Sequence, residues 1–205
     1  REALLTTLGF SQVKPAAQFL QRVERLYRRG SGQRFRLTAL FERPDMQGGS
    51  FYVFDLVETS GDETTHVASG SVAYISPDLR LPRFHASGRL ALEGKAGAWM
   101  AGMAEKVVSW AATRVGMSRL DLGEFSEIDE RLMVLAEDET AAQAFLTRER
   151  LGRLLWLANP ERLSEIDCGG DCFVVRRAAG KKSGDIEADL RSLLDDAKRA
   201  LTALS

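Results

Sequence analysis

The sequence has few of the residues that most often carry chemistry or covalent bracing. Its 205 residues include only two cysteines and two histidines. Two cysteines cannot build the disulfide framework of a small secreted domain. A chain of this length buries roughly 70% of its unfolded surface when it folds. We therefore expect a globular protein that is stable without a disulfide or a metal ion.

An excess of charge of one sign is also missing. The chain has 28 basic and 29 acidic residues, which gives a formal net charge of -1. Proteins that bind nucleic acid or anionic membranes through electrostatics carry a basic surplus. The composition therefore indicates no nucleic-acid partner and no direct electrostatic attraction to a lipid surface.

No apolar run is long enough to cross a membrane, and no signal peptide is present. The closest approach is the segment from Ala96 to Met117, which Glu105, Lys106 and Arg114 interrupt. Its spacing predicts a buried core helix at about 96–115. The alternative is a stripe that faces a membrane or a partner, made by Trp99, Met100, Met103 and Trp110.

The first part of the chain predicts one helix followed by strands. Apolar residues recur at helical spacing over 15–29. From about 34 to 87, aromatic and β-branched residues alternate with polar ones between short turns. Four such strands favour an antiparallel four-strand meander. Pro82 marks the fourth as an edge or bulged strand, because proline cannot donate to a sheet ladder.

The remainder, 120–204, predicts a strand, two short helices, a hairpin and an amphipathic C-terminal helix. Asp138 and Thr147 stand where they would cap the two short helices. Strands and helices come in runs and do not alternate strictly, which favours the α+β class with a mainly antiparallel sheet packed with helices. We expect residues 1–205 to form a single globular domain.

Both cysteines, Cys168 and Cys172, lie in the stretch SEIDCGGDCFVV. Their C-x3-C spacing differs from the C-x2-C of redox and zinc motifs. A structural zinc needs four ligands, which His66 and His85 could complete only from a distant part of the chain. The simpler interpretation is a hairpin with a three-residue loop, 169–171. The two thiols would then face one another across the strands and stay reduced.

The two histidines and the acidic clusters are the other candidate sites. His66 or His85 could act as a general base or a metal ligand, but each is expected on the solvated face of a strand. Carboxylates flank the strand near 132–136 and the helix that follows it. Acids at a helix start suit the helix dipole, and we expect no catalytic, cofactor-binding or metal-binding residue among them.

Three segments carry a resemblance to a known family. They are FYVFDLVETSGDETTHVASGSVAYI, LPRFHAS and LGEFSEIDERLMVLAEDETAAQAFLTRERLGRLL, and a glycine hairpin and a final helix follow them. Together they resemble the soluble domain of uncharacterised bacterial membrane-anchored proteins, a domain of unknown function. The resemblance implies one or two transmembrane helices and a position on the cytoplasmic side of the membrane. The chain begins at Arg1, so the anchor is expected upstream.

These observations favour a non-catalytic binding or assembly domain. Its partner would be another protein or a second copy of the chain, and no cofactor is expected. The alternative is a hydrolase or redox enzyme that uses Cys168 and Cys172, or one of His66 and His85. A histidine within reach of a serine or cysteine in a cleft would favour the enzyme.

Overall fold

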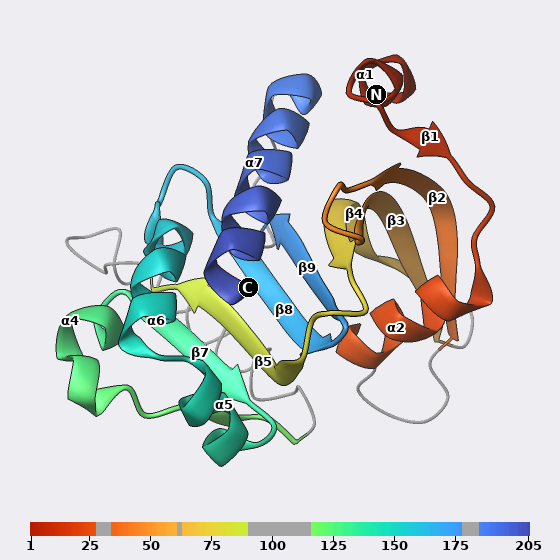
Figure 1. Cartoon of the computed structure of the whole chain (residues 1–205). Coiled ribbons are helices and arrows are strands. Elements are labelled where there is room, and N and C mark those ends of the chain that lie inside the picture. The colour runs from red at the N-terminus through yellow and green to blue at the C-terminus, as the bar shows by residue number, and fades with distance from the viewer. Residues whose placement is uncertain (28–33, 61–62, 90–115, 178–184) are drawn as a thin grey trace.

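The computed structural model describes residues 1–27, 34–60, 63–89, 116–177 and 185–205, with residues 60 and 63–69 described through their backbone alone. Within these ranges nine strands form one antiparallel sheet in the order β1-β2-β3-β4-β9-β8-β5-β7-β6 (Figure 1). The strands are β1 (Ser11–Gln12), β2 (Arg34–Pro44), β3 (Ser50–Ser60), β4 (Glu63–Ile75), β5 (Leu81–Gly88), β6 (Ser118–Arg119), β7 (Leu132–Ala136), β8 (Ser164–Gly170) and β9 (Cys172–Arg177).

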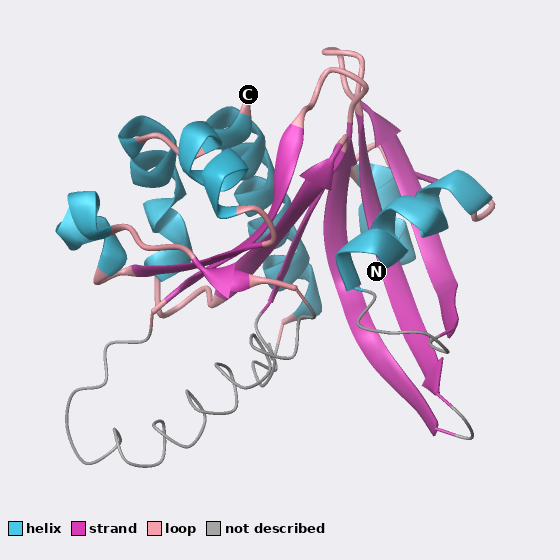
Figure 2. Cartoon of the chain, turned by 90° about the horizontal axis from the view of Figure 1, so that it is seen from below, coloured by secondary structure: helices cyan, strands magenta, loops and turns pink. Residues whose placement is uncertain are grey.

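Helices cover both faces of this sheet. Figure 2 shows most of them gathered on one side of the C-terminal strands. The helices are α1 (Glu2–Thr7), α2 (Ala17–Tyr27), α4 (Ser126–Asp129), α5 (Glu139–Phe145), α6 (Arg148–Leu154) and α7 (Ile186–Leu204), with short 3-10 turns η1 (Gly123–Phe125) and η2 (Leu155–Ala158).

The two faces of the sheet bury separate hydrophobic clusters. The larger cluster packs the sheet against α1 and α4–α7, and the smaller one packs the opposite face against α2. Alternation along the strands sends neighbouring residues to different clusters. Phe173 and Val175 of β9 belong to the larger cluster, whereas Cys172 and Val174 belong to the smaller one.

The α+β class, the mainly antiparallel sheet and the C-terminal helix are confirmed. Both predicted caps are present, since Asp138 accepts a hydrogen bond from Ala141 N and Thr147 accepts one from Arg150 N. The predicted helix at 15–29 is α2, Ala17–Tyr27. The predicted helix at 96–115, with Trp99, Met100, Met103 and Trp110, lies outside the described residues.

The pairing of β5 differs from the predicted meander. Strands β2, β3 and β4 pair in sequence order, but β4 then pairs with β9, and β5 lies between β8 and β7. Strand β5 is therefore internal and not an edge. The register on its β8 side shifts between Leu81 and Phe84, around Pro82, whose missing N–H interrupts the ladder.

Candidate functional site: charged residues buried in the sheet

The β8–β9 hairpin that holds both cysteines has a shorter turn than predicted. Gly169 pairs with Cys172, so only Gly170 and Asp171 form the loop, and Gly170 takes a positive φ of 65°. Directly opposed residues point to the same face of a sheet. Cys168 is opposite Phe173 and belongs to the larger hydrophobic cluster, whereas Cys172 belongs to the smaller one.

The predicted approach of the two thiols across the hairpin is therefore wrong. Cys168 and Cys172 are both free and lie on opposite faces of the sheet. Burial raises the pKa of both thiols well above their ordinary value, and the neighbouring Asp167 and Asp171 carboxylates raise it further. A protonated, buried thiol is a poor nucleophile and a poor metal ligand.

His85 is not on a solvated face, which corrects a second prediction. It lies in the internal strand β5 and is 1% exposed. Its Nδ1 is 3.1 Å from Oδ1 of Asp167, the residue directly opposite it on β8. His66 lies in β4 opposite Val57, in the part of the strand described through its backbone alone.

Asp167 links His85 to a larger ionic network on the same face of the sheet. Arg176 of β9 donates from Nε to Oδ2 of Asp167 at 3.3 Å. Nη2 of Arg176 lies 2.6 Å from Oε2 of Glu165, as an ion contact that is not aligned as a hydrogen bond. The guanidinium also lies 5.7 Å from the ring centre of Tyr27, at the end of α2. Strands β8 and β9 and helix α2 thus meet at this arginine, and β5 joins the network through the contact of His85 with Asp167.

The electrostatics of this network follow from its burial. Glu165, Asp167 and Arg176 are each less than 8% exposed. Burial alone would lower the pKa of Arg176, but the charges of Glu165 and Asp167 outweigh it and raise that pKa. Buried charges of this kind are tolerated when they are paired with opposite charges. The guanidinium therefore stays charged and holds both carboxylates in place.

The pair formed by His85 and Asp167 has the contact that orients a catalytic histidine in serine hydrolases. Such a pair also needs a nucleophile and access for a substrate. Ser87 follows on the same face of β5, and its buried Oγ has no hydrogen-bond partner among the described residues. However, the second oxygen of Asp167 is occupied by Arg176, and His85 is buried. This geometry is that of a structural ion network.

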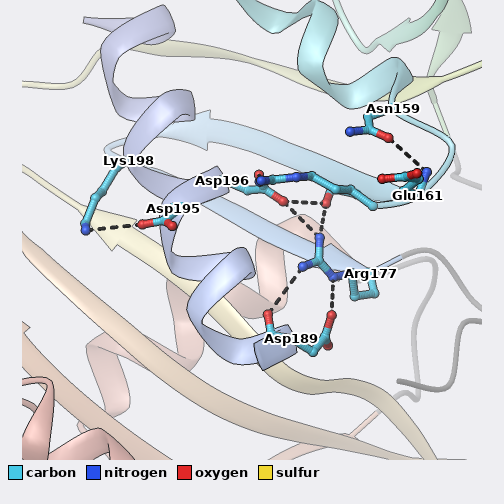
Figure 3. Close-up of polar contacts among 9 residues, drawn as sticks. Asn159, Glu161, Arg177, Asp189, Asp195, Asp196 and Lys198 are labelled. Carbon is cyan, nitrogen blue, oxygen red and sulfur yellow. Dashed lines mark hydrogen bonds and ion pairs between the residues drawn. The ribbon is translucent and has the colours of Figure 1, made fainter. Parts of the chain in front are cut away.

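A second polar cluster attaches α7 to the opposite face of β8 and β9 (Figure 3). Asp196 is fully buried, and its carboxylate contacts Arg162, Ser164 and Arg177. Arg177 also donates from Nε to Oδ1 of Asp189 at 2.8 Å. Two arginines thus face two aspartates, so the cluster is neutral and has no charge left for a ligand.

Both clusters were missed from the sequence, although a signal for each is present. Glu165 is directly opposite Arg176 in the hairpin, and such cross-strand pairs of opposite charge stabilise antiparallel sheets. Asp189 and Asp196 are seven residues apart, so two helical turns place them on one face of α7. Asp196 follows Leu193 and Leu194 in the apolar stripe, and a charge at such a position indicates a buried partner.

Acidic residues around β7 also pair with arginines, but these pairs lie nearer the surface than the two buried clusters. Asp129 contacts both Arg89 and Arg119, Glu127 contacts Arg148, and Glu137 is 3.1 Å from Arg83. Among the described residues, no three His, Cys, Asp or Glu side chains are placed to hold a metal ion.

Three surface grooves lined by described residues have volumes of about 320, 420 and 560 Å³. None of these three is lined by His85, Asp167, Cys168 or Cys172. These three grooves and the four candidate residues His85, Asp167, Cys168 and Cys172 are therefore in different places. No helix in the described part of the chain is long and apolar enough to span a membrane.

Comparison with known proteins gives one similar structure. No family model matches the chain, and no curated protein matches it. The fold is similar to the crystal structure of the mycobacterial trehalose monomycolate transport factor A, TtfA, with a TM-score of 0.52. The alignment covers 98% of this chain and 88% of that one, at 13% sequence identity. At this identity the similarity shows a shared fold.

Proposed function

We propose that this chain is a non-catalytic binding or assembly domain of a bacterial membrane-anchored protein, at the cytoplasmic face of the membrane. One observation carries the proposal. The His85 and Asp167 pair, the strongest acid–base candidate, is buried and tied to Arg176, so the pair is part of the packing between strands. General acid–base catalysis needs a group within hydrogen-bonding reach of a substrate.

The fold supports the assembly part of the proposal. The structure that resembles this one is named as a transport factor. The membrane part rests on the resemblance of the strand, turn and helix segments to membrane-anchored proteins. The partner would be a protein or a second copy of the chain, held near the membrane by a segment outside these 205 residues.

The non-catalytic role is tested by removing the reactive groups while keeping the fold. A strain that lacks the gene should be restored by a Cys168→Ala/Cys172→Ala variant and by His85→Gln, at wild-type protein levels. Both thiols are buried without a bond between them, and glutamine keeps a polar group opposite Asp167. A stable His85→Gln protein that fails to restore the strain would contradict the proposal and favour an enzyme.

The membrane part is tested by fractionating cells that express the complete gene product. We expect the protein in the membrane fraction after a carbonate wash, and protected from protease added outside intact cells. Recovery of the intact product in the soluble fraction would contradict the membrane location, whatever the outcome of the complementation test.

A hydrolase is the second candidate, and the contact between His85 and Asp167 is the observation that favours it. In a hydrolase, Asp167→Asn would lose turnover by far more than its loss of stability explains. In an assembly domain, the same change would act through stability alone. Measuring unfolding and cellular function together for this variant separates the two roles.

A further inference from the structure

A groove of about 560 Å³ lies beside the last strand of the sheet. One wall is the chain that leaves β6 and forms η1, residues 120–125. The other wall is the end of α5 and the residue after it, with Gln143, Leu146 and Thr147. Figure 1 shows the first of these segments, coloured green, passing α5 on its way to α4. The volume is typical of binding sites, which enclose about 300–1,000 Å³.

The floor of this groove is apolar. Leu120, Leu122 and Leu146 line it, and all three belong to the larger hydrophobic cluster. Phe125 also lines the groove and packs against the same cluster, but it is only half-buried. The groove therefore opens onto the edge of the main core, where apolar side chains of another molecule would lose contact with water.

Strand β6 adds an open sheet edge to the groove. It is the last strand of the sheet, and β7 is the one described strand that pairs with it. Leu120 N donates to Val134 O at 2.9 Å, so the backbone of Leu120 faces β7. Successive residues of an antiparallel strand turn their backbone groups to opposite sides. The N–H and C=O groups of Arg119 and Asp121 therefore point away from β7, and such groups are a template for another strand.

The side chains around the groove are acidic. Asp121 and Glu124 line it, and none of the described residues that line it is basic. Both are exposed, and no arginine or lysine forms an ion pair with either of them in the described ranges. The excess of acid extends beyond the lining, with five acidic and two basic residues in 118–131 and four acidic and one basic in 137–149. This field attracts a cationic partner and repels an acidic one.

We infer that β6 and this groove bind an extended segment of a partner protein, in which apolar residues alternate with lysine or arginine. The segment pairs with β6 through the free backbone groups of Arg119 and Asp121. Side chains alternate across a strand, so every second residue of the segment points into the groove and contacts its leucines. The acidic surroundings favour basic residues at the other positions. The inference rests on the proposed assembly role and specifies the chemistry of the partner.

Four labelled heptapeptides test this chemistry against the 205-residue chain, with binding followed by fluorescence anisotropy. The peptide KLKLKLK has both features of the inferred segment. The peptide ELELELE reverses its charge, and KSKSKSK removes its apolar side chains. The fourth is KLKLKLK with methyl groups on the backbone nitrogens of its inner residues, which keeps the side chains but cannot donate hydrogen bonds to a sheet edge.

The variants change the groove at exposed positions, so that folding is preserved. Gln143→Arg places a cation in the groove, and Ala144→Arg is the matched control, because Ala144 is the next exposed residue of α5 and does not line the groove. Asp121→Asn/Glu124→Gln removes both acidic charges of the lining. Asparagine at 121 keeps the oxygen that accepts from Gly123 N at 2.8 Å.

We expect KLKLKLK to bind about tenfold or more tightly than each of the other three peptides. Gln143→Arg and the double variant should each weaken its binding by a similar factor, and Ala144→Arg should weaken it much less. No binding of KLKLKLK overturns the inference, as does an equal loss in Gln143→Arg and Ala144→Arg. Equal binding of the methylated peptide also overturns it, because the groove would then take an amphiphilic cation without strand pairing.

A second copy of the chain is the other possible occupant, and light scattering without peptide tests it. A wild-type dimer that Gln143→Arg dissociates would assign the groove to a second copy and overturn the inference. A monomer in both proteins agrees with the inference. The complementation and fractionation tests of the proposed function do not depend on this groove, so a failure here is distinguishable from a failure there.

Discussion

The imidazole of His85 faces the carboxylate of Asp167 across β5 and β8, with 3.1 Å between Nδ1 and Oδ1. The two residues are direct partners in the antiparallel ladder, so backbone register holds them together. The other oxygen of Asp167 accepts from Arg176 of β9. The histidine is therefore tied to a carboxylate that also neutralises a buried guanidinium, and this contact links three central strands.

Removing the charge of Asp167 should destabilise the protein strongly. Asp167→Asn leaves Arg176 with one of its two printed carboxylate contacts, Glu165, inside the sheet. Breaking a buried ion pair from one side costs about 3–5 kcal/mol, so we expect a loss of about 3 kcal/mol in the free energy of unfolding. Urea unfolding followed by circular dichroism measures it.

The matched control for this change is Asp195→Asn. Asp195 is 60% exposed and contacts Lys198 at 3.4 Å on the surface of α7. Exposed pairs of this kind contribute about 0–1 kcal/mol. An equal loss of unfolding free energy in Asp167→Asn and Asp195→Asn would show that the buried network does not stabilise the sheet.

Asp196 should determine how firmly α7 is attached to the sheet. Asp196→Asn removes the negative charge that Arg162 and Arg177 share, while Asp189 still contacts Arg177. We expect faster amide hydrogen exchange along α7, with little change in the β2–β3 hairpin. Exchange in α7 that matches the wild type would mean that hydrophobic packing alone holds the helix.

The β8–β9 hairpin shows how far the sequence alone could lead. Its two strands and glycine turn were predictable from local patterns. The side-chain directions were not, because they depend on the length of the loop. A change of one residue in register sends every side chain of one strand to the other face. A three-residue loop would have placed Cys168 opposite Cys172, whereas the two-residue turn separates them. The cross-strand charges of Glu165 and Arg176 were the available indication of the true register.

Strand β5 shows a different limit. Alternation in LPRFHAS predicts a strand, but it says nothing about which strands lie beside it. The partners β8 and β7 come from much later in the chain. Because His85 is buried by this non-local pairing, its environment could not be predicted from its neighbours in sequence. Predicting the candidate site therefore required the strand order of the sheet. Predicting the helix caps at Asp138 and Thr147 required only the neighbouring residues in the sequence.

Both thiols should be unreactive in the folded protein. Burial raises the pKa of Cys168 and Cys172, so neither forms the reactive thiolate at about pH 8. We expect a disulfide reagent such as DTNB to label them slowly in buffer and fast in urea. Mass spectrometry after mild oxidation should show no intramolecular disulfide. Rapid labelling of the native protein would show that at least one thiol is reachable.

Two tyrosines should make the protein less stable in strong alkali. The pKa of Tyr52 and that of Tyr74 both rise from 10.0 to about 12, chiefly through burial, and also through their hydrogen bonds to Glu42 and Asp45. A group whose pKa is higher in the folded state loses its proton first in the unfolded chain. The contribution of such a group to the free energy of unfolding is therefore complete below its pKa in the unfolded chain. It is lost as the pH rises from about 10 to about 12.

Urea unfolding at a series of pH values tests this effect. The free energy of unfolding should fall across that interval, and the fall should be smaller in a Tyr52→Phe/Tyr74→Phe variant, which has no phenol at these positions to titrate. Tyr27→Phe is not a suitable control, because Tyr27 contacts the Arg176 network. A slope that is the same in the wild type and the double variant would mean that other groups cause the alkaline loss. Cys168 and Cys172 would then be the next groups to replace, because their raised pKa acts in the same direction but begins to lower the stability nearer pH 9.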